Sequence, residues 1–124
     1  MISFDDFIAE NGIPIYLQVV RHVKRQIASG AVKDGDEMIS RRTLSALLGV
    51  NPNTVQKAYA LLEAEGLICS HSGAKSYVVL TDESVERVRS ELMENEIQSV
   101  VSSLKVMGLD KETAVKLIER MWDQ

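Results

Sequence analysis

The stretch Ser40–Gly66, SRRTLSALLGVNPNTVQKAYALLEAEG, decides the fold of this 124-residue chain. Its first half repeats apolar residues at the spacing of one buried helical stripe, namely Leu44, Leu47 and Leu48. Gly49 is a typical helix stop. Asn51 and Pro52 then supply a capping residue and a proline at the first helical position. The stretch therefore predicts two short helices joined by a glycine-containing turn, a helix-turn-helix.

The second helix has a polar side opposite its apolar residues. Asn53 and Gln56 each hold a hydrogen-bond donor beside an acceptor, the pairing that an adenine edge presents in the major groove. Thr54 and Lys57 can hold phosphates, and so can two arginines near the start of the first helix. This face predicts contact with double-stranded DNA. The alternative is an ordinary helical hairpin with a solvated polar face.

Strand-forming residues follow on both sides of a turn rich in serine and glycine. Leu67–Ser70 and Ser76–Leu80 predict the two strands of a hairpin. A hairpin directly after a helix-turn-helix is the wing of a winged helix, and small or basic residues at its tip suit a phosphate or the minor groove. The candidate DNA-binding residues are therefore Arg41, Arg42, Asn51, Asn53, Thr54, Gln56, Lys57, Ser72, Gly73 and Lys75.

One further helix is predicted before this block. Pro14–Ser29 places its apolar residues on a single stripe, which is typical of a helix packed on a core. His22 lies near the edge of that stripe, and we interpret it as structural because no partner stands at metal-ligand spacing. In the short lead-in before this helix, Phe4, Phe7 and Ile8 are expected to form one helical turn that packs on the body.

The C-terminal third predicts two helices with unpartnered apolar seams. Thr81 caps a long helix that ends near Met107, and Asp110 caps a last helix, Lys111–Trp122. Two helices cannot bury both seams by themselves, so we expect a second copy of the chain to cover them in a symmetric dimer. The alternative is a fold-back on the chain's own winged helix. The expected dimerisation residues are Val85, Val88, Leu92, Ile97, Val100, Val101, Leu104, Leu117, Ile118, Met121 and Trp122.

Together these segments predict a mostly α fold with a small β-hairpin. We expect a winged helix-turn-helix DNA-binding domain over residues 1–80, lead-in included, and a two-helix dimerisation tail over residues 81–124. The net charge of −4 is unusual for a protein that binds phosphates, but it is unevenly distributed. Residues 14–80 hold eight basic and five acidic side chains, a balance of +3 on the candidate DNA-binding part.

Composition and motifs argue against several function classes. No apolar run approaches the roughly 18–20 residues that span a bilayer, and the first residues do not resemble a secretory signal. Cys69 is the single cysteine and cannot form an internal disulfide, which fits a reducing, cytoplasmic location. Asp34-Gly35-Asp36 is a turn signal without the twelve-residue loop of a calcium site. The sequence shows no nucleophile–base pair, phosphate loop or metal cluster, so we expect neither catalysis nor a cofactor.

The block Pro14–Val79 resembles the GntR family of bacterial transcription regulators. Several landmarks carry the resemblance and keep their spacing, namely Pro14-Ile15-Tyr16-Leu17-Gln18, Ile27-Ala28-Ser29-Gly30, Gly35-Asp36, Leu47–Tyr59 and Leu62–Ile68. The short two-helix tail resembles the YtrA-like subfamily, whose members lack a large effector domain. The resemblance implies a dimeric DNA-binding repressor, often found beside genes for ABC-type transporters.

Three positions depart from the family pattern. The residues before Ser40 lack the usual proline. Arg42 matches the family's conserved arginine, but Thr43 replaces the glutamate that follows it, which removes the usual capping-box partner of Ser40. The wing sequence Gly73-Ala74-Lys75 keeps only the first glycine of the Gly-x-Gly pattern, and Lys75 adds a charge there.

We therefore predict a sequence-specific DNA-binding transcription regulator, a repressor that binds a pseudo-palindromic operator as a homodimer. Asn53 and Gln56 are expected to read bases. The residues expected to position the DNA backbone are Arg42, Thr54, Lys57, Ser72, Gly73 and Lys75. The alternative is a winged-helix protein-interaction module without specific DNA binding, which the acidic tail favours. A separate ligand domain needs more chain than this. The small-molecule effector is unknown, and the alternatives are a ligand in the dimer seam, which would alter the spacing of the two DNA-binding heads, and no effector.

Overall fold

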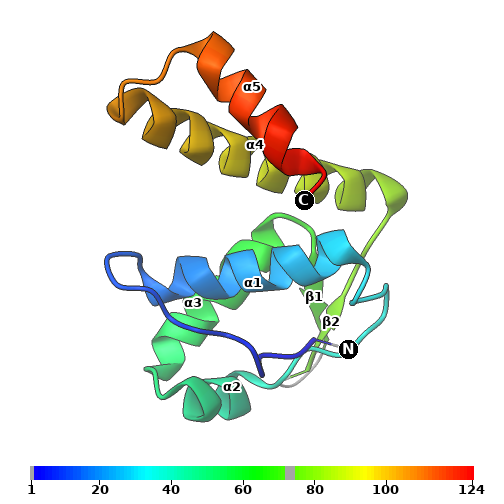
Figure 1. Cartoon of the computed structure of the whole chain (residues 1–124). Helices are drawn as coiled ribbons and strands as arrows, with labels where there is room; N and C mark the ends of the chain where they lie inside the picture. Colours follow the sequence, from blue (N-terminus) through cyan, green and yellow to red (C-terminus); the bar gives the residue numbers. More distant parts are fainter. Residues whose placement is uncertain (1, 72–74) are drawn as a thin grey trace. The chain divides into compact units, whose positions relative to one another are not determined.

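A computed structural model describes residues 2–71 and 75–124 of the chain. In these residues five helices and two short strands follow one another (Figure 1). They are α1 (Ile15–Ser29), α2 (Arg41–Leu48), α3 (Pro52–Ala64), β1 (Ile68–Ser70), β2 (Ser76–Val78), α4 (Asp82–Val106) and α5 (Lys111–Trp122). The predicted mostly α fold with one antiparallel hairpin is confirmed.

The chain divides into two compact units, Met1–Arg89 and Ser90–Gln124. The first unit contains the winged helix-turn-helix together with the first turns of α4. The second unit contains the rest of α4 and all of α5. The predicted boundary between functional domains, after residue 80, stays a prediction.

The helix-turn-helix begins and ends at local sequence signals. The hydroxyl of Ser40 accepts a hydrogen bond from the backbone N–H of Thr43 at 3.1 Å, and the side chain of Asn51 caps α3 in the same way. Gly49 ends α2 in the left-handed conformation, with φ of +68°. The loss of the usual glutamate therefore leaves the Ser40 cap intact, and the Ser40 hydroxyl also donates to the Thr43 hydroxyl at 2.7 Å.

The core of the first unit includes a layer in which α1 packs on α3 (Figure 1). Val55, Tyr59 and Leu62 of α3 are fully buried, as the apolar side of the predicted second helix requires. α2 contributes Leu44 to this core. Leu47 differs from its predicted place on the buried stripe, because it is 59% exposed. The buried side of α2 runs instead through Leu44 and Ser45.

The predicted hairpin forms with Ile68 opposite Val78 and Ser70 opposite Ser76. The connector between α1 and α2 lies along the other edge of β2. There the N–H of Met38 donates to the carbonyl of Ser76 at 2.9 Å, and Glu37 pairs with Tyr77 in an isolated bridge. The wing therefore has backbone partners on the side away from β1, which fixes β2 against the body of the unit.

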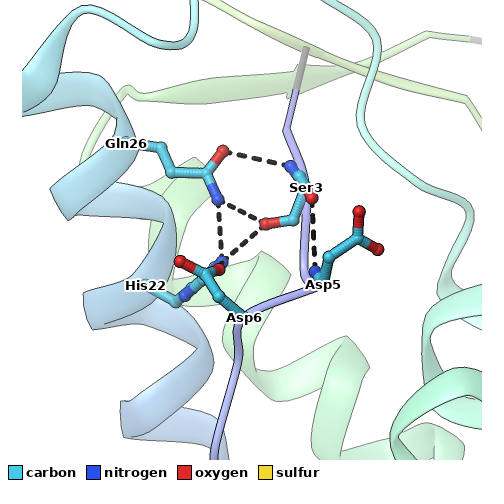
Figure 2. A network of polar contacts seen from close by, with 5 residues as sticks. All are labelled: Ser3, Asp5, Asp6, His22 and Gln26. Carbon is cyan, nitrogen blue, oxygen red and sulfur yellow. Dashed lines mark hydrogen bonds and ion pairs between the residues drawn. The ribbon is translucent and has the colours of Figure 1, made fainter.

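The lead-in packs on α1 as predicted, but it contains a turn and no helix. Ile2 and Phe4 are buried, whereas Ile8 is 83% exposed, so one helical turn does not describe it. Figure 2 shows how α1 holds the chain: the side chain of Gln26 accepts from the N–H of Ser3 at 3.0 Å and donates to its carbonyl. His22 contacts the same carbonyl and stacks on Phe4, which agrees with its structural interpretation.

The second unit is a helical hairpin, and many of its large apolar residues are exposed. Asp110 caps α5 by accepting from the N–H of Thr113 at 2.9 Å, and this hydrogen bond holds the pKa of Asp110 below its usual value. The described residues of α5 include none that are buried. An apolar groove of about 420 Å³ lies between α5 and the second half of α4, with Val101, Leu104 and Ile118 among its lining residues.

Candidate nucleic-acid interface

The outer side of α3 presents the two amide side chains that the sequence singled out. Asn53 and Gln56 are both exposed, while Val55 and Tyr59 on the opposite side are fully buried. The capped N-terminus of α3 brings Asn53 close to the turn after α2. Because α3 is anchored by its buried side, both amides are held outward on a rigid element, which is what readout of a base edge requires.

Other candidate residues on α3 have partners inside the fold. The side-chain oxygen of Asn51 accepts from the N–H of Asn53 at 2.8 Å, which commits this residue to capping α3, while its NH₂ group can still donate to a phosphate. The ammonium group of Lys57 lies 4.1 Å from the centre of the Tyr16 ring on α1, a cation–π contact. Thr54 is half-buried. The exposed side of α3 therefore combines two outward amides with one cation near the start of α1.

The two neighbouring arginines of α2 have different environments. Arg42 is exposed, as a contact to a DNA backbone requires. Arg41 is half-buried, and its guanidinium donates to the hydroxyls of Ser76 at 3.2 Å and Ser70 at 3.3 Å. The same guanidinium lies 5.0 Å from the centre of the Tyr59 ring. The sequence made both arginines candidate DNA-binding residues and matched only Arg42 to the family's conserved arginine, but it gave no indication that Arg41 turns toward the wing.

The sequence did not predict the polar network that Ser70 and Ser76 form at the base of the wing. The hydroxyls of Ser70 and Ser76 lie 3.2 Å apart across the hairpin, and that of Ser70 also donates to the Glu63 carboxylate at 3.3 Å. Arg41 binds both serines, so the network joins α2, α3, β1 and β2. The only sequence signal was the symmetric position of the two serines around the turn, which is too common to point to an arginine.

The tip of the wing contributes one described candidate residue. The ammonium group of Lys75 lies 3.5 Å from the carboxylate of Glu37, and both side chains are exposed. Water screens this pair, so it holds Lys75 only weakly and leaves it able to exchange Glu37 for a phosphate. Ser72 and Gly73, the other two wing candidates, lie outside the described residues.

Tyr59 connects α3 to the start of α2. Its hydroxyl donates to the carbonyl of Ile39 at 2.6 Å, directly before the capping residue Ser40. Burial raises the pKa of Tyr59 well above its usual value, and the nearby charge of Arg41 opposes this shift. The angle between the two helices of the helix-turn-helix is thus tied by a buried hydrogen bond as well as by apolar packing.

The apolar residues expected at a dimer interface fall into three groups by their exposure. Val88 belongs to the core of one chain, since it is only 2% exposed, and we remove it from the proposed dimer surface. Val85, Leu92, Leu104 and Leu117 are half-buried. The remaining members are at least 39% exposed, and they are Ile97, Val100, Val101, Ile118, Met121 and Trp122.

The described parts of the chain contain neither a metal-binding cluster nor a membrane-spanning helix. Among residues 2–71 and 75–124, His, Cys, Asp and Glu do not gather in groups of three or more that could hold a metal ion. Within the same ranges, every helix is too short or too polar to cross a bilayer.

A family model and a relative match this chain in sequence. The family model is described as bacterial regulatory proteins, gntR family, and it matches residues 15–78. The HTH-type transcriptional repressor YtrA of Bacillus subtilis (strain 168) is 32% identical over 121 residues, which cover 98% of this chain and 86% of that protein. The second alignment extends through both α4 and α5, so the likeness includes the tail.

Solved structures agree in fold with the chain. A GntR family transcriptional regulator from Listeria monocytogenes is 27% identical with a TM-score of 0.78, covering 91% of this chain and 99% of that one. YtrA from Sulfolobus acidocaldarius, a GntR-family transcription factor, is 30% identical with a TM-score of 0.54 and covers 92% of each chain.

Proposed function

The chain belongs to the GntR family of bacterial regulatory proteins and is a transcription regulator of that family, and from this premise we propose that it binds a specific operator in double-stranded DNA as a homodimer. The observation that carries the proposal is the outward pair of amides, Asn53 and Gln56, on a helix whose opposite side is fully buried. These side chains match the donor and acceptor of an adenine edge in the major groove.

Backbone contacts would set the register of α3 in the groove. Arg42, at the start of α2, is exposed, and Lys57 adds a cation on the outward side of α3. Lys75, Ser72 and Gly73 would contact the phosphates or the minor groove from the wing. The balance of +3 over residues 14–80 supports this assignment, since phosphate neutralisation supplies much of the affinity for DNA.

The exposed apolar surface of the tail supports the homodimer. Trp122 is 80% exposed and Ile97 is 63% exposed, and unpartnered apolar side chains of this size mark an interaction surface. A second copy offers the same surface, so the two can close around a two-fold axis. Such a dimer would place its two α3 helices on half-sites about one helical turn, or a multiple of it, apart.

We further propose repression as the regulatory effect and the cytoplasm as the location. The Bacillus relative carries the name of a transcriptional repressor, and bound regulators at a promoter can exclude polymerase from it. The resemblance to the YtrA-like subfamily supports a neighbouring ABC-type transporter operon as the target. A small-molecule effector is not part of this proposal.

The test begins with a duplex that the wild-type protein selects from a random pool. Gln56→Ala should weaken binding to this duplex by about 1–3 kcal/mol and relax the preference at one base pair. Gln98→Ala is the matched control, because Gln98 is an exposed glutamine on α4 that is not among the candidate DNA-binding residues. An unchanged affinity and base preference in the Gln56 variant would refute the assigned reading face.

Salt dependence separates this proposal from a protein-interaction module. Binding through four or more phosphate contacts should give a log–log slope on the order of −4 or steeper. Failure to select any sequence, with a flat response to salt, would favour the interaction module instead. A footprint on the promoters beside the gene would then locate the operator for a protein that passes both tests.

A further inference from the structure

The guanidinium of Arg41 is directed toward the base of the wing, where it bonds Ser70 and Ser76. Its Nε atom is buried and has no hydrogen-bond partner among the described residues. Its two terminal nitrogens bind Ser76 and Ser70, and its plane lies near the ring of Tyr59. A phosphate cannot reach the inner edge of this group, because that edge is closed to solvent.

The two serines occupy the point where the wing leaves the sheet. Ser70 is the last residue of β1, Ser76 is the first residue of β2, and they are direct partners in the strand register. Beyond them, the N–H of His71 donates to the carbonyl of Lys75 at 3.0 Å. A single forked side chain on α2 therefore holds both strands of the hairpin at its mouth.

Arg42 provides an internal comparison at the next position. Both arginines lie in the first turn of α2, but Arg42 is exposed and Arg41 is half-buried against the wing. A guanidinium can bridge two hydroxyls because its donors form a rigid planar fork, whereas a lysine ammonium acts as a single point of charge. The two neighbours are therefore suited to different tasks.

We propose that Arg41 is a positioning residue that fixes the wing relative to the helix-turn-helix, and that it is not a phosphate ligand. The consequence for DNA rests on the proposed function above. The consequence for the wing does not, since the bonds of Arg41 to Ser70 and Ser76 exist within the free protein. Through these bonds the orientation of α2 determines where Lys75 is presented.

The first experiment measures amide hydrogen exchange in the free protein. Arg41→Gln should accelerate exchange of the His71 amide about tenfold, because the wing mouth loses two hydrogen bonds to a charged donor. Amides in the middle of α1 should keep their wild-type rates, which a general loss of stability would not allow. Arg42→Gln is the matched control and should leave the His71 amide unchanged.

Arg41→Lys separates geometry from charge. The lysine keeps the positive charge but cannot bridge both serines, so we expect fast exchange of the His71 amide, as in Arg41→Gln. If Arg41→Lys restored wild-type exchange, or if neither variant changed the His71 amide relative to α1, the bracing role would be refuted. Arg41→Lys also serves as the second variant if Arg41→Gln fails to fold.

The second experiment uses the selected duplex and a double-mutant cycle with Lys75→Gln. Lys75→Gln raises the dissociation constant by one factor in the wild-type background and by another in the Arg41→Gln background. If Arg41 positions the wing, the second factor should be at least threefold smaller than the first. Additive losses, together with full recovery of affinity in Arg41→Lys, would mean that Arg41 contacts phosphate directly. If the wild-type protein selects no duplex, the proposed function fails while the exchange experiment still decides the role of Arg41.

Discussion

The buried hydroxyl of Tyr59 provides a quantitative test of how the helix-turn-helix is held together. The side chain is fully buried, and its hydroxyl donates to the carbonyl of Ile39 at 2.6 Å. Tyr59→Phe keeps the ring and removes this one bond. A lost buried hydrogen bond that leaves its acceptor without a partner costs about 1–2 kcal/mol in the free energy of unfolding. In a chain of this length the melting temperature should fall by about 4–8 °C.

The destabilisation caused by this substitution should disappear as the pH rises. Burial raises the pKa of Tyr59 in the folded state, whereas in the unfolded chain the pKa is about 10. Above pH 10 the unfolded state loses a proton that the folded state keeps, so the wild-type protein loses about 1.4 kcal/mol of stability per pH unit. The phenylalanine variant has no such loss. The two proteins should therefore be about equally stable near pH 11.

Urea unfolding followed by circular dichroism, from pH 7 to pH 11.5 and at one fixed protein concentration, measures both effects. The other titrating groups are common to the two proteins and cancel in the difference. Tyr77→Phe is the control, because in the described chain the Tyr77 hydroxyl has no hydrogen bond and its ring is only half-buried. Its stability should stay within about 0.5 kcal/mol of wild type at pH 7. Equal stability of Tyr59→Phe and wild type at pH 7, or a difference that does not change with pH, would refute the reasoning.

Three further substitutions test other parts of the structure. Ser40→Ala removes the cap of α2 and should lower the free energy of unfolding by about 1 kcal/mol in a urea melt. Ser102→Ala changes an exposed serine inside α4 and is the control, and an equal loss in both variants would contradict a capping role. Gln18→Ala removes three hydrogen bonds to the lead-in, so a protease should cleave residues 2–13 faster than in the wild-type protein. An unchanged cleavage rate would show that Gln18 does not anchor the lead-in. Ile118→Glu places a charge on the exposed apolar side of α5 and should give a monomer in analytical ultracentrifugation. Lys116→Glu changes an exposed side chain of the same helix and should leave the dimer intact. A dimer that persists in Ile118→Glu would mean that the interface lies elsewhere.

Short-range signals were sufficient for most helices and for the hairpin. The caps at Ser40, Asn51 and Asp110 bind backbone groups within three residues, so the residues that decide them are adjacent in sequence. The bounds of α5 follow directly from such a cap and from an uninterrupted apolar period. The helix-turn-helix and the outward place of Gln56 were likewise predictable, because the apolar stripe of one helix determines its opposite side.

Contacts between distant residues decided what the sequence could not. The family resemblance identified Arg42 as the conserved arginine but gave Arg41 no separate role. The inward position of Arg41 depends on strands that lie 29 and 35 residues further along the chain. The lead-in contains aromatic residues that suggested a helical turn. Instead of a helical turn, the lead-in has an irregular backbone that is held by the side chain of Gln26, which binds Ser3 from 23 residues away.

Which apolar residues along α4 are buried could likewise be known only from the tertiary structure. Val88 and Ile97 both belong to the apolar residues whose spacing predicts a covered side of α4. This spacing does not tell whether the same chain or a second chain covers each residue. In the folded chain Val88 is inside the core and Ile97 is 63% exposed. The sequence thus determined the elements and their polar sides, since these depend on neighbours along the chain. Tertiary packing decided which arginine faces inward and how much of the apolar seam is left for a partner, because both depend on residues that meet only after folding.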